Sequence, residues 1–241
     1  MESDINIVND DYSPFRKIRT LCVRFNTPLA MHEIPLFRGA IISAVTQSET
    51  LFHNHIDDSF RYRYPLIQYK RIGKNAAIVC VEDGVEAFGN FFESATSEIM
   101  LGERAACLEV ASVTARQELI QIWDSMFSYH LNSWIALNQT NYKSYRQMDG
   151  IAEKMAFLEK ILTGNILSMA KSMGIHFDNE IKTVITDVAK PRDVLYKNTK
   201  VMSFDISFKC NVSLPNYIGI GKGCSIGYGI IKKQYSREDG K

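Results

Sequence analysis

Alternation of apolar and polar residues predicts several β-strands in this chain. Residues 21–25 alternate Leu, Val and Phe with Cys and Arg, a period of two that is typical of a half-buried strand. The alternation is clearest in residues 202–208, where Met, Phe, Ile and Phe are separated by Ser, Asp and Ser. Shorter β-like runs predict further strands at 107–113, 129–137 and 184–188.

Apolar residues recur every three or four positions in three other stretches, as they do along one face of a helix. Residues 36–45 form the first stripe, and Pro35 is compatible with the first turn of that helix. Residues 85–92 mark a second short helix. The third stretch, residues 151–173, is the longest.

The ends of this long helix carry recognisable signals. Asp149 suits the N-cap, and Gly174 suits the position after the C-cap. Inside the pattern, Gly164-Asn165 is a candidate break that would divide the helix into two pieces.

Two β-like runs, residues 62–70 and 76–81, flank Gly73-Lys74-Asn75 and predict a β-hairpin. With the helices on either side, the first half then has the order β-α-β-β-α-β, which is the ferredoxin-like unit. The second half follows the same order more loosely, without a repeat in the sequence itself. The predicted fold class is α+β, with two tandem ferredoxin-like (RRM-like) domains.

The length of 241 residues gives between one and two domains at about 150 residues per domain. With 46% hydrophobic and 23% charged residues, the composition is typical of a soluble globular protein. We expect an N-terminal domain over residues 16–120 with a histidine-bearing loop, and a C-terminal domain over residues 121–241 with a glycine-rich loop. No Pro/Gly/Ser-rich linker marks the boundary, which we place between residues 114 and 128.

Cysteine usage and the lack of long apolar segments favour the cytoplasm. The five cysteines are odd in number and form no CxxC pair, so neither a disulfide framework nor a zinc knuckle is indicated. The N-terminus lacks the apolar core of a signal peptide. No stretch approaches about 20 uninterrupted apolar residues, so we expect no membrane association.

The formal charge of +1 excludes a globally polycationic protein, so any nucleic-acid binding must use a local patch. Two stretches are basic. Residues 190–241 contain ten Lys or Arg against four Asp or Glu, and residues 59–74 contain five basic residues and no acid. Three tyrosines within the second stretch are candidates for stacking on bases: Tyr62, Tyr64 and Tyr69.

Residues 215–229 hold five of the chain's 14 glycines. They match neither a dinucleotide fingerprint, because Ile226 stands at the third glycine position, nor a P-loop, because Gly223 follows Lys222. Closely spaced glycines allow backbone amides to approach a phosphate chain. The alternative is a tight β-turn followed by a glycine-containing edge strand.

Together these features resemble the RAMP superfamily and, within it, the b-type branch of the Cas6 CRISPR repeat-processing endoribonucleases. The resemblance rests on the ferredoxin-like first half, the histidine-bearing loop after its first helix and the terminal Gly-Ile-Gly-Lys-Gly-x-x-x-Gly-Tyr-Gly motif. It implies metal-independent cleavage of CRISPR repeat RNA, without a cofactor, leaving a 5′-hydroxyl and a 2′,3′-cyclic or 3′ phosphate. The implied partners are precursor crRNA and CRISPR effector complex subunits, and homodimers occur in related proteins.

The chemistry of RNA cleavage can be matched to particular residues. Attack by the ribose 2′-hydroxyl needs a base, an acid and a cation near the phosphorane. Imidazole serves as acid or base near neutral pH. His53 and His55 lie two positions apart in one predicted loop, so an extended backbone points both to the same side. The resemblance implies such a pair followed by a tyrosine, here Tyr62; which histidine is acid and which is base stays open.

The cation for the phosphorane has three candidates, of which Lys70 is preferred over Arg61 and Arg63. His32 is a reserve catalytic candidate, and His130 and His176 are expected to be structural. We expect RNA contacts from basic side chains and from the backbone of the glycine-rich loop, namely Arg61, Arg63, Gly219, Gly221, Lys222, Gly223, Gly227, Gly229 and Lys232.

Three alternatives are open. The run from His53 to Asp58 partly matches the His-x-His-x-Asp-His motif of dinuclear metallohydrolases, although its last histidine is replaced by Asp58. The chain could also be a non-catalytic RNA-binding subunit of a CRISPR ribonucleoprotein. A pair of ferredoxin-like domains that binds a small ligand would leave both basic stretches unexplained.

Overall fold

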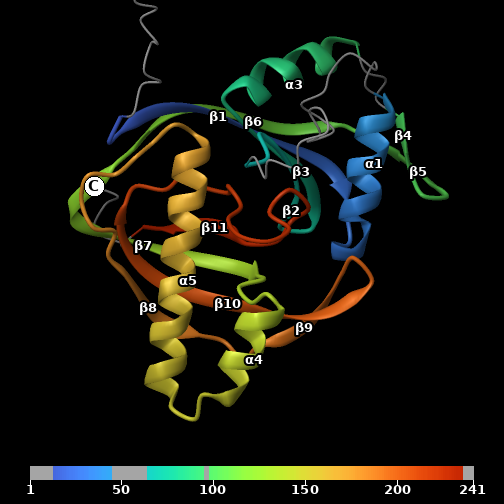
Figure 1. The fold of residues 1–241 in the computed structure, drawn as a ribbon. Coiled ribbons are helices and arrows are strands. Elements are labelled where there is room, and N and C mark those ends of the chain that lie inside the picture. The colour runs from blue at the N-terminus through green and yellow to red at the C-terminus, as the bar shows by residue number, and fades with distance from the viewer. Residues whose placement is uncertain (1–12, 45–63, 95–97, 236–241) are drawn as a thin grey trace, which may run out of the picture.

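The computed structural model describes residues 13–44, 64–94 and 98–235. Figure 1 shows two β-sheets, one above the other, with α3 over the upper sheet and α5 in front of the lower one. The glycine-rich part of the chain, coloured red, runs between them. In the described part of the chain, no helix is both long enough and apolar enough to cross a membrane.

The first half of the chain forms a four-stranded sheet with the order β2-β3-β1-β6. Its elements are β1 (Arg16–Pro28), the 3-10 helix η1 (Met31–Glu33), α1 (Ile34–Ala44), β2 (Ile67–Ile72), β3 (Asn75–Val81), α3 (Asp83–Ser94) and β6 (Val110–Ile120). A separate hairpin of β4 (Glu98–Leu101) and β5 (Arg104–Cys107) precedes β6. The order and pairing are those of the ferredoxin-like unit, which confirms the prediction.

The second half forms a sheet with the order β11-β7-β10-β8, and β9 pairs with β10 beyond it. Its elements are β7 (Ile122–Trp134), α4 (Gln139–Gln147), α5 (Ile151–Ser172), β8 (Thr183–Val188), β9 (Arg192–Tyr196), β10 (Thr199–Val212) and β11 (Ile230–Gln234). Residues 213–229 stand where the unit would have its second helix, and they contain none. The glycine-rich segment, as we call residues 213–229, therefore replaces that helix.

Helix α5 differs from the prediction in two details. It runs without a break through Gly164-Asn165. Gly164 is exposed, and the Asn165 side chain accepts a hydrogen bond from the Trp134 indole at 2.9 Å, so the packing of α5 outweighs the weak helix propensity of both residues. The N-cap is Gly150 rather than Asp149. At the other end Gly174 has φ +72°, as expected for the residue after the C-cap.

The two sheets share one buried core. One face of the upper sheet packs on α1 and α3 through residues such as Phe37, Phe88 and Ile78. Its other face contributes Ile18 and Val79 to the core that surrounds α5 and the lower sheet. Leu214, Ile218 and Ile220 of the glycine-rich segment belong to this core, so both halves of the chain pack against the segment.

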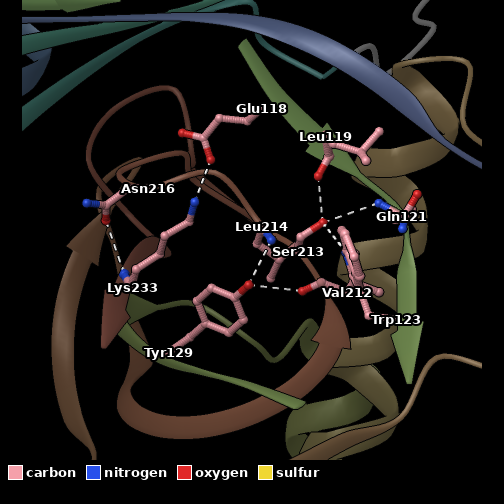
Figure 2. A network of polar contacts seen from close by, with 10 residues as sticks. All are labelled: Glu118, Leu119, Gln121, Trp123, Tyr129, Val212, Ser213, Leu214, Asn216 and Lys233. Atoms are coloured by element: carbon pink, nitrogen blue, oxygen red, sulfur yellow. Dashed lines mark hydrogen bonds and ion pairs between the residues drawn. The ribbon is translucent and has the colours of Figure 1, made fainter. Parts of the chain in front are cut away.

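Hydrogen bonds fix the connection between the two sheets (Figure 2). The Ser213 hydroxyl accepts from the Trp123 indole at 2.9 Å. The Tyr129 hydroxyl donates to the Val212 carbonyl at 3.0 Å and accepts from the Leu214 amide at 2.8 Å. These contacts hold the start of the glycine-rich segment against the point where the chain passes from β6 to β7.

An ion pair crosses the same connection (Figure 2). Lys233 Nζ on β11 lies 2.5 Å from Glu118 Oε2 on β6. The Lys233 amide also donates to the Asn216 side chain at 3.1 Å. The side chains of the pair are 24% and 14% exposed, so it is a partly buried link between the two halves.

Candidate functional site

The histidine-bearing segment joins α1 to β2, and its described end lies against the glycine-rich segment. His53, His55, Arg61, Tyr62 and Arg63 lie outside the described residues. The chain resumes at Tyr64, whose hydroxyl donates to the Gly219 carbonyl at 2.8 Å. Burial raises the pKa of the Tyr64 phenol, which keeps it protonated as a donor.

Strand β2 binds the glycine-rich segment through its backbone and one side chain. The Tyr69 amide donates to the Ser225 carbonyl at 2.8 Å. Gln68 accepts from the Gly219 amide at 2.8 Å and is fully buried. The Tyr64 hydroxyl, the Tyr69 amide and the Gln68 side chain each bond to the glycine-rich segment. Together they fix its position relative to β2.

Lys70, the preferred cation for the phosphorane, is fully buried beneath this segment. Its Nζ lies 3.4 Å from the Cys224 carbonyl, and no ion pair in the described part of the chain includes it. Burial lowers the pKa of Lys70 to about 8, against a smaller opposing effect of the Cys224 and Cys22 thiols. Its side chain lies in the interior and donates toward a backbone carbonyl, which suits a positioning role; a contact of Lys70 with the phosphorane stays a prediction.

Three glycines of the segment are buried rather than accessible: Gly219, Gly227 and Gly229. Gly229 has φ +61°, and a Cβ on it would collide with the Ile220 carbonyl. A Cβ on Gly227 would lie 2.5 Å from Ile34. These glycines therefore allow close packing, and RNA contacts from them stay a prediction.

The accessible part of the segment is residues 221–223. Lys222 is exposed, and Gly221 and Gly223 are half-buried. Lys232 is also exposed. Its backbone pairs with that of His130 in β7, whereas the backbone of Lys222 forms an isolated β-bridge with Ile135. Ile135 lies just beyond the end of β7, whereas His130 lies within it, so the two lysines occupy different positions on the surface.

The remaining aromatic and histidine candidates occupy various environments. Tyr69 is fully buried and packs edge to face on Phe37, with ring centroids 5.9 Å apart, so the expectation that it stacks on bases is wrong. His32 is exposed on η1. His130 lies in β7 with Nδ1 3.2 Å from the Ser207 hydroxyl, in line with a structural role. The amide of His176 donates to the Ser13 carbonyl at 2.9 Å.

Sequence reasoning missed Gln68 and the Asn165–Trp134 contact. The alternation of Gln68 and Lys70 with Ile67 and Tyr69 predicts a half-exposed strand, so it gives no signal that both polar side chains are buried. Nothing in the sequence pairs Asn165 with Trp134, because the contact joins separate elements.

The fold described above also occurs in other solved structures. A structure described as a RAMP protein binding different RNA substrates has a similar fold. That structure has a TM-score of 0.56 and 13% identity and covers 91% of this chain and 99% of its own. At this identity the likeness shows the fold alone.

Two family models match the chain. The Cas6b N-terminal domain matches residues 16–119, and the Cas6b C-terminal domain matches residues 121–234. The chain belongs to the Cas6b family.

Solved structures and a sequence relative agree with this assignment. A crystal structure of Cas6b has a TM-score of 0.80 and 26% identity, over 91% of this chain and all of the other. A structure described as the CRISPR RNA processing endoribonuclease Cas6b has a TM-score of 0.70 and 25% identity, with the same coverage. An uncharacterized protein of Methanocaldococcus jannaschii is 38% identical over 109 residues, which are 45% of this chain and 73% of the relative.

Proposed function

We propose that this chain cleaves CRISPR repeat RNA, without a metal ion, by attack of a ribose 2′-hydroxyl on the adjacent phosphate. Membership of the Cas6b family supports repeat RNA as the substrate. The observation that carries the proposal is the hydrogen bond from Tyr64 to Gly219, at 2.8 Å. It ties the end of the histidine-bearing segment to the glycine-rich segment, so both can act on one RNA strand.

The reaction needs two proton transfers. One imidazole of the His53–His55 pair accepts the proton of the 2′-hydroxyl, while the 2′-oxygen forms its bond to phosphorus. The other protonates the departing 5′-oxygen as the P–O bond breaks. The products are a 2′,3′-cyclic phosphate and a 5′-hydroxyl. In this scheme Tyr62 assists the pair, and Arg61 or Arg63 supplies positive charge at the phosphorane.

The described residues contribute position rather than chemistry. Tyr64 and Gln68 hold Gly219, and Lys70 donates toward the carbonyl of Cys224. Lys222, exposed beside them, offers a cation to the RNA backbone. We therefore expect variants of the histidines to affect cleavage and variants of the exposed lysines to affect binding.

The test uses repeat RNA from the CRISPR arrays of the source genome, incubated with the full chain in EDTA. We expect His53→Ala and His55→Ala each to bind the RNA nearly as wild type and to cut it at least about 100-fold more slowly. His32→Ala tests the reserve candidate, an exposed histidine on η1, and should cut normally if the His53–His55 pair carries both proton transfers. Unchanged cleavage by both loop variants would contradict the proposal.

Other outcomes identify the alternatives. Cleavage that is lost in EDTA and restored by added Mn²⁺ supports the metallohydrolase. Tight binding by the wild type without any cleavage supports the non-catalytic subunit. As part of the same proposal we place the protein in the cytoplasm, with precursor crRNA as substrate and with effector complex subunits or a second copy of the chain as partners.

A further inference from the structure

The tip of the β9–β10 hairpin packs against the glycine-rich segment through two tyrosines and two lysines. We call Tyr196, Lys197, Lys222 and Tyr228 the hairpin cluster. The rings of Tyr196 and Tyr228 meet edge to face, with centroids 5.7 Å apart and planes at 84°. The Tyr228 hydroxyl donates to the Leu195 carbonyl at 2.9 Å. These contacts fasten the hairpin to the segment.

Backbone geometry holds the cluster in place. Lys197 and Asn198 have φ of 48° and 60°, as in a type I′ turn, which gives a tight two-residue hairpin. Gly223 has φ +75°, and a Cβ there would lie 2.8 Å from the rings of both Tyr196 and Tyr228. The glycine at this position therefore allows the two rings to close around the segment.

The lysines of the cluster carry charge that no carboxylate neutralises in the described part of the chain. None of the ion pairs there includes Lys197 or Lys222, and both residues are exposed. Their Nζ atoms lie 5.9 Å and 5.2 Å from the centroid of the Tyr196 ring. Cation–π contacts at exposed sites are weak, so either ammonium group can leave the ring for an anionic partner.

We propose that the hairpin cluster binds one nucleotide of single-stranded RNA beside the glycine-rich segment. The unpaired base stacks on the Tyr196 ring, and Lys197 and Lys222 leave the ring to bind the two flanking phosphates. An aromatic platform with adjacent cations is the arrangement that binds single strands without reading their sequence. The inference rests on the proposed function, because it names a contact that the substrate RNA makes.

Substitutions separate stacking from charge. Tyr196→Leu removes the ring, Tyr196→Phe keeps it, and the double variant Lys197→Gln/Lys222→Gln removes both cations. Lys160→Gln on α5 is the control, since Lys160 is exposed and outside the ion pairs of the described residues. Dissociation constants are measured for repeat RNA and for a short oligouridylate across a series of salt concentrations, after thermal unfolding has verified that each variant folds.

We expect Tyr196→Leu to weaken binding of both RNAs about 5-fold or more, with an unchanged salt dependence, and Tyr196→Phe to bind as wild type. The double lysine variant should reduce the slope of log K against log salt by about 1.4. Lys160→Gln should change neither quantity.

Wild-type affinity in both Tyr196→Leu and the double lysine variant, with cleavage of repeat RNA intact, would overturn the inference and leave the proposed function standing. Equal loss in Tyr196→Phe and Tyr196→Leu would also overturn it, since stacking needs only the ring. A wild-type chain that neither binds nor cuts repeat RNA would instead reject the proposed function.

Discussion

At the scale of single residues, Lys70 shows how this fold holds a cation in its interior. The side chain is fully buried between β2 and the glycine-rich segment, and its Nζ faces the Cys224 carbonyl. A charge removed from water without a carboxylate partner is costly. Its retention at the centre of the connection between the domains is consistent with a role in positioning the segment.

Lys70→Met should make the protein more stable at neutral pH. The pKa lowered from 10.5 to about 8 corresponds to about 3 kcal/mol of destabilisation, which is fully present below pH 8. Because the unfolded chain binds more protons between pH 8 and 10.5, wild-type stability should rise in that range, and the advantage of the variant should shrink. Urea unfolding of both proteins at pH 7 and pH 9.5 measures this difference. An advantage that is equal at both pH values would contradict the account.

Gly229→Ala should destabilise the protein by about 1–3 kcal/mol or more. The residue has φ +61°, and the added Cβ would meet the Ile220 carbonyl. Gly164→Ala is the matched control: it lies inside α5, nothing lies within 4 Å of its added Cβ, and a gain of about 0.5–1 kcal/mol is expected. Chemical denaturation of the two variants gives both values, and equal stability of Gly229→Ala and wild type would be the contrary result.

At the scale of elements, much of the fold follows from periodicity. The stripe of residues 36–45 predicted α1, and the turn around Gly73 predicted the β2–β3 hairpin, although β2 is Ile67–Ile72 rather than 62–70. The β4–β5 hairpin was missed, because β4 has only four residues and its apolar run of Ile99, Met100 and Leu101 shows no alternation. The second helix of the C-terminal unit is missing because the glycines of residues 213–229 disfavour a helix. Glycine content does not, however, predict the conformation that this segment adopts instead.

One hydrogen bond between elements links the histidine-bearing segment to the site. Tyr64→Phe removes the donor to Gly219, with an expected loss of about 1 kcal/mol of stability. The cleavage rate should fall more than RNA affinity, because the end of the segment loses its anchor. Tyr142→Phe on α4, at an exposed tyrosine, serves as the control. Single-turnover rates and dissociation constants measure the split; a loss of affinity without a loss of rate would argue against an anchoring role.

At the scale of the whole molecule, the two halves act as one body. The back of the upper sheet, α5 and the glycine-rich segment share a core, and the Glu118–Lys233 pair crosses the connection. None of this was predictable, because alternation tells which residues share a face of a strand but not which sheet covers that face. The sequence predicted the residues of the candidate site but not which of them are buried. The burial of Gly219, Gly227 and Gly229 and the exposure of Lys222 depend on that tertiary packing.

The central claim, attack by a ribose 2′-hydroxyl without a metal, is tested most directly on the RNA itself. The bond cut in repeat RNA is first mapped, and the ribose on its 5′ side is then replaced by 2′-deoxyribose. In EDTA we predict that the wild-type chain binds this RNA as tightly as the unmodified repeat and does not cut it, whereas the unmodified repeat yields a 2′,3′-cyclic or 3′ phosphate by mass spectrometry. Cleavage of the deoxy-substituted repeat at the same bond would contradict the account.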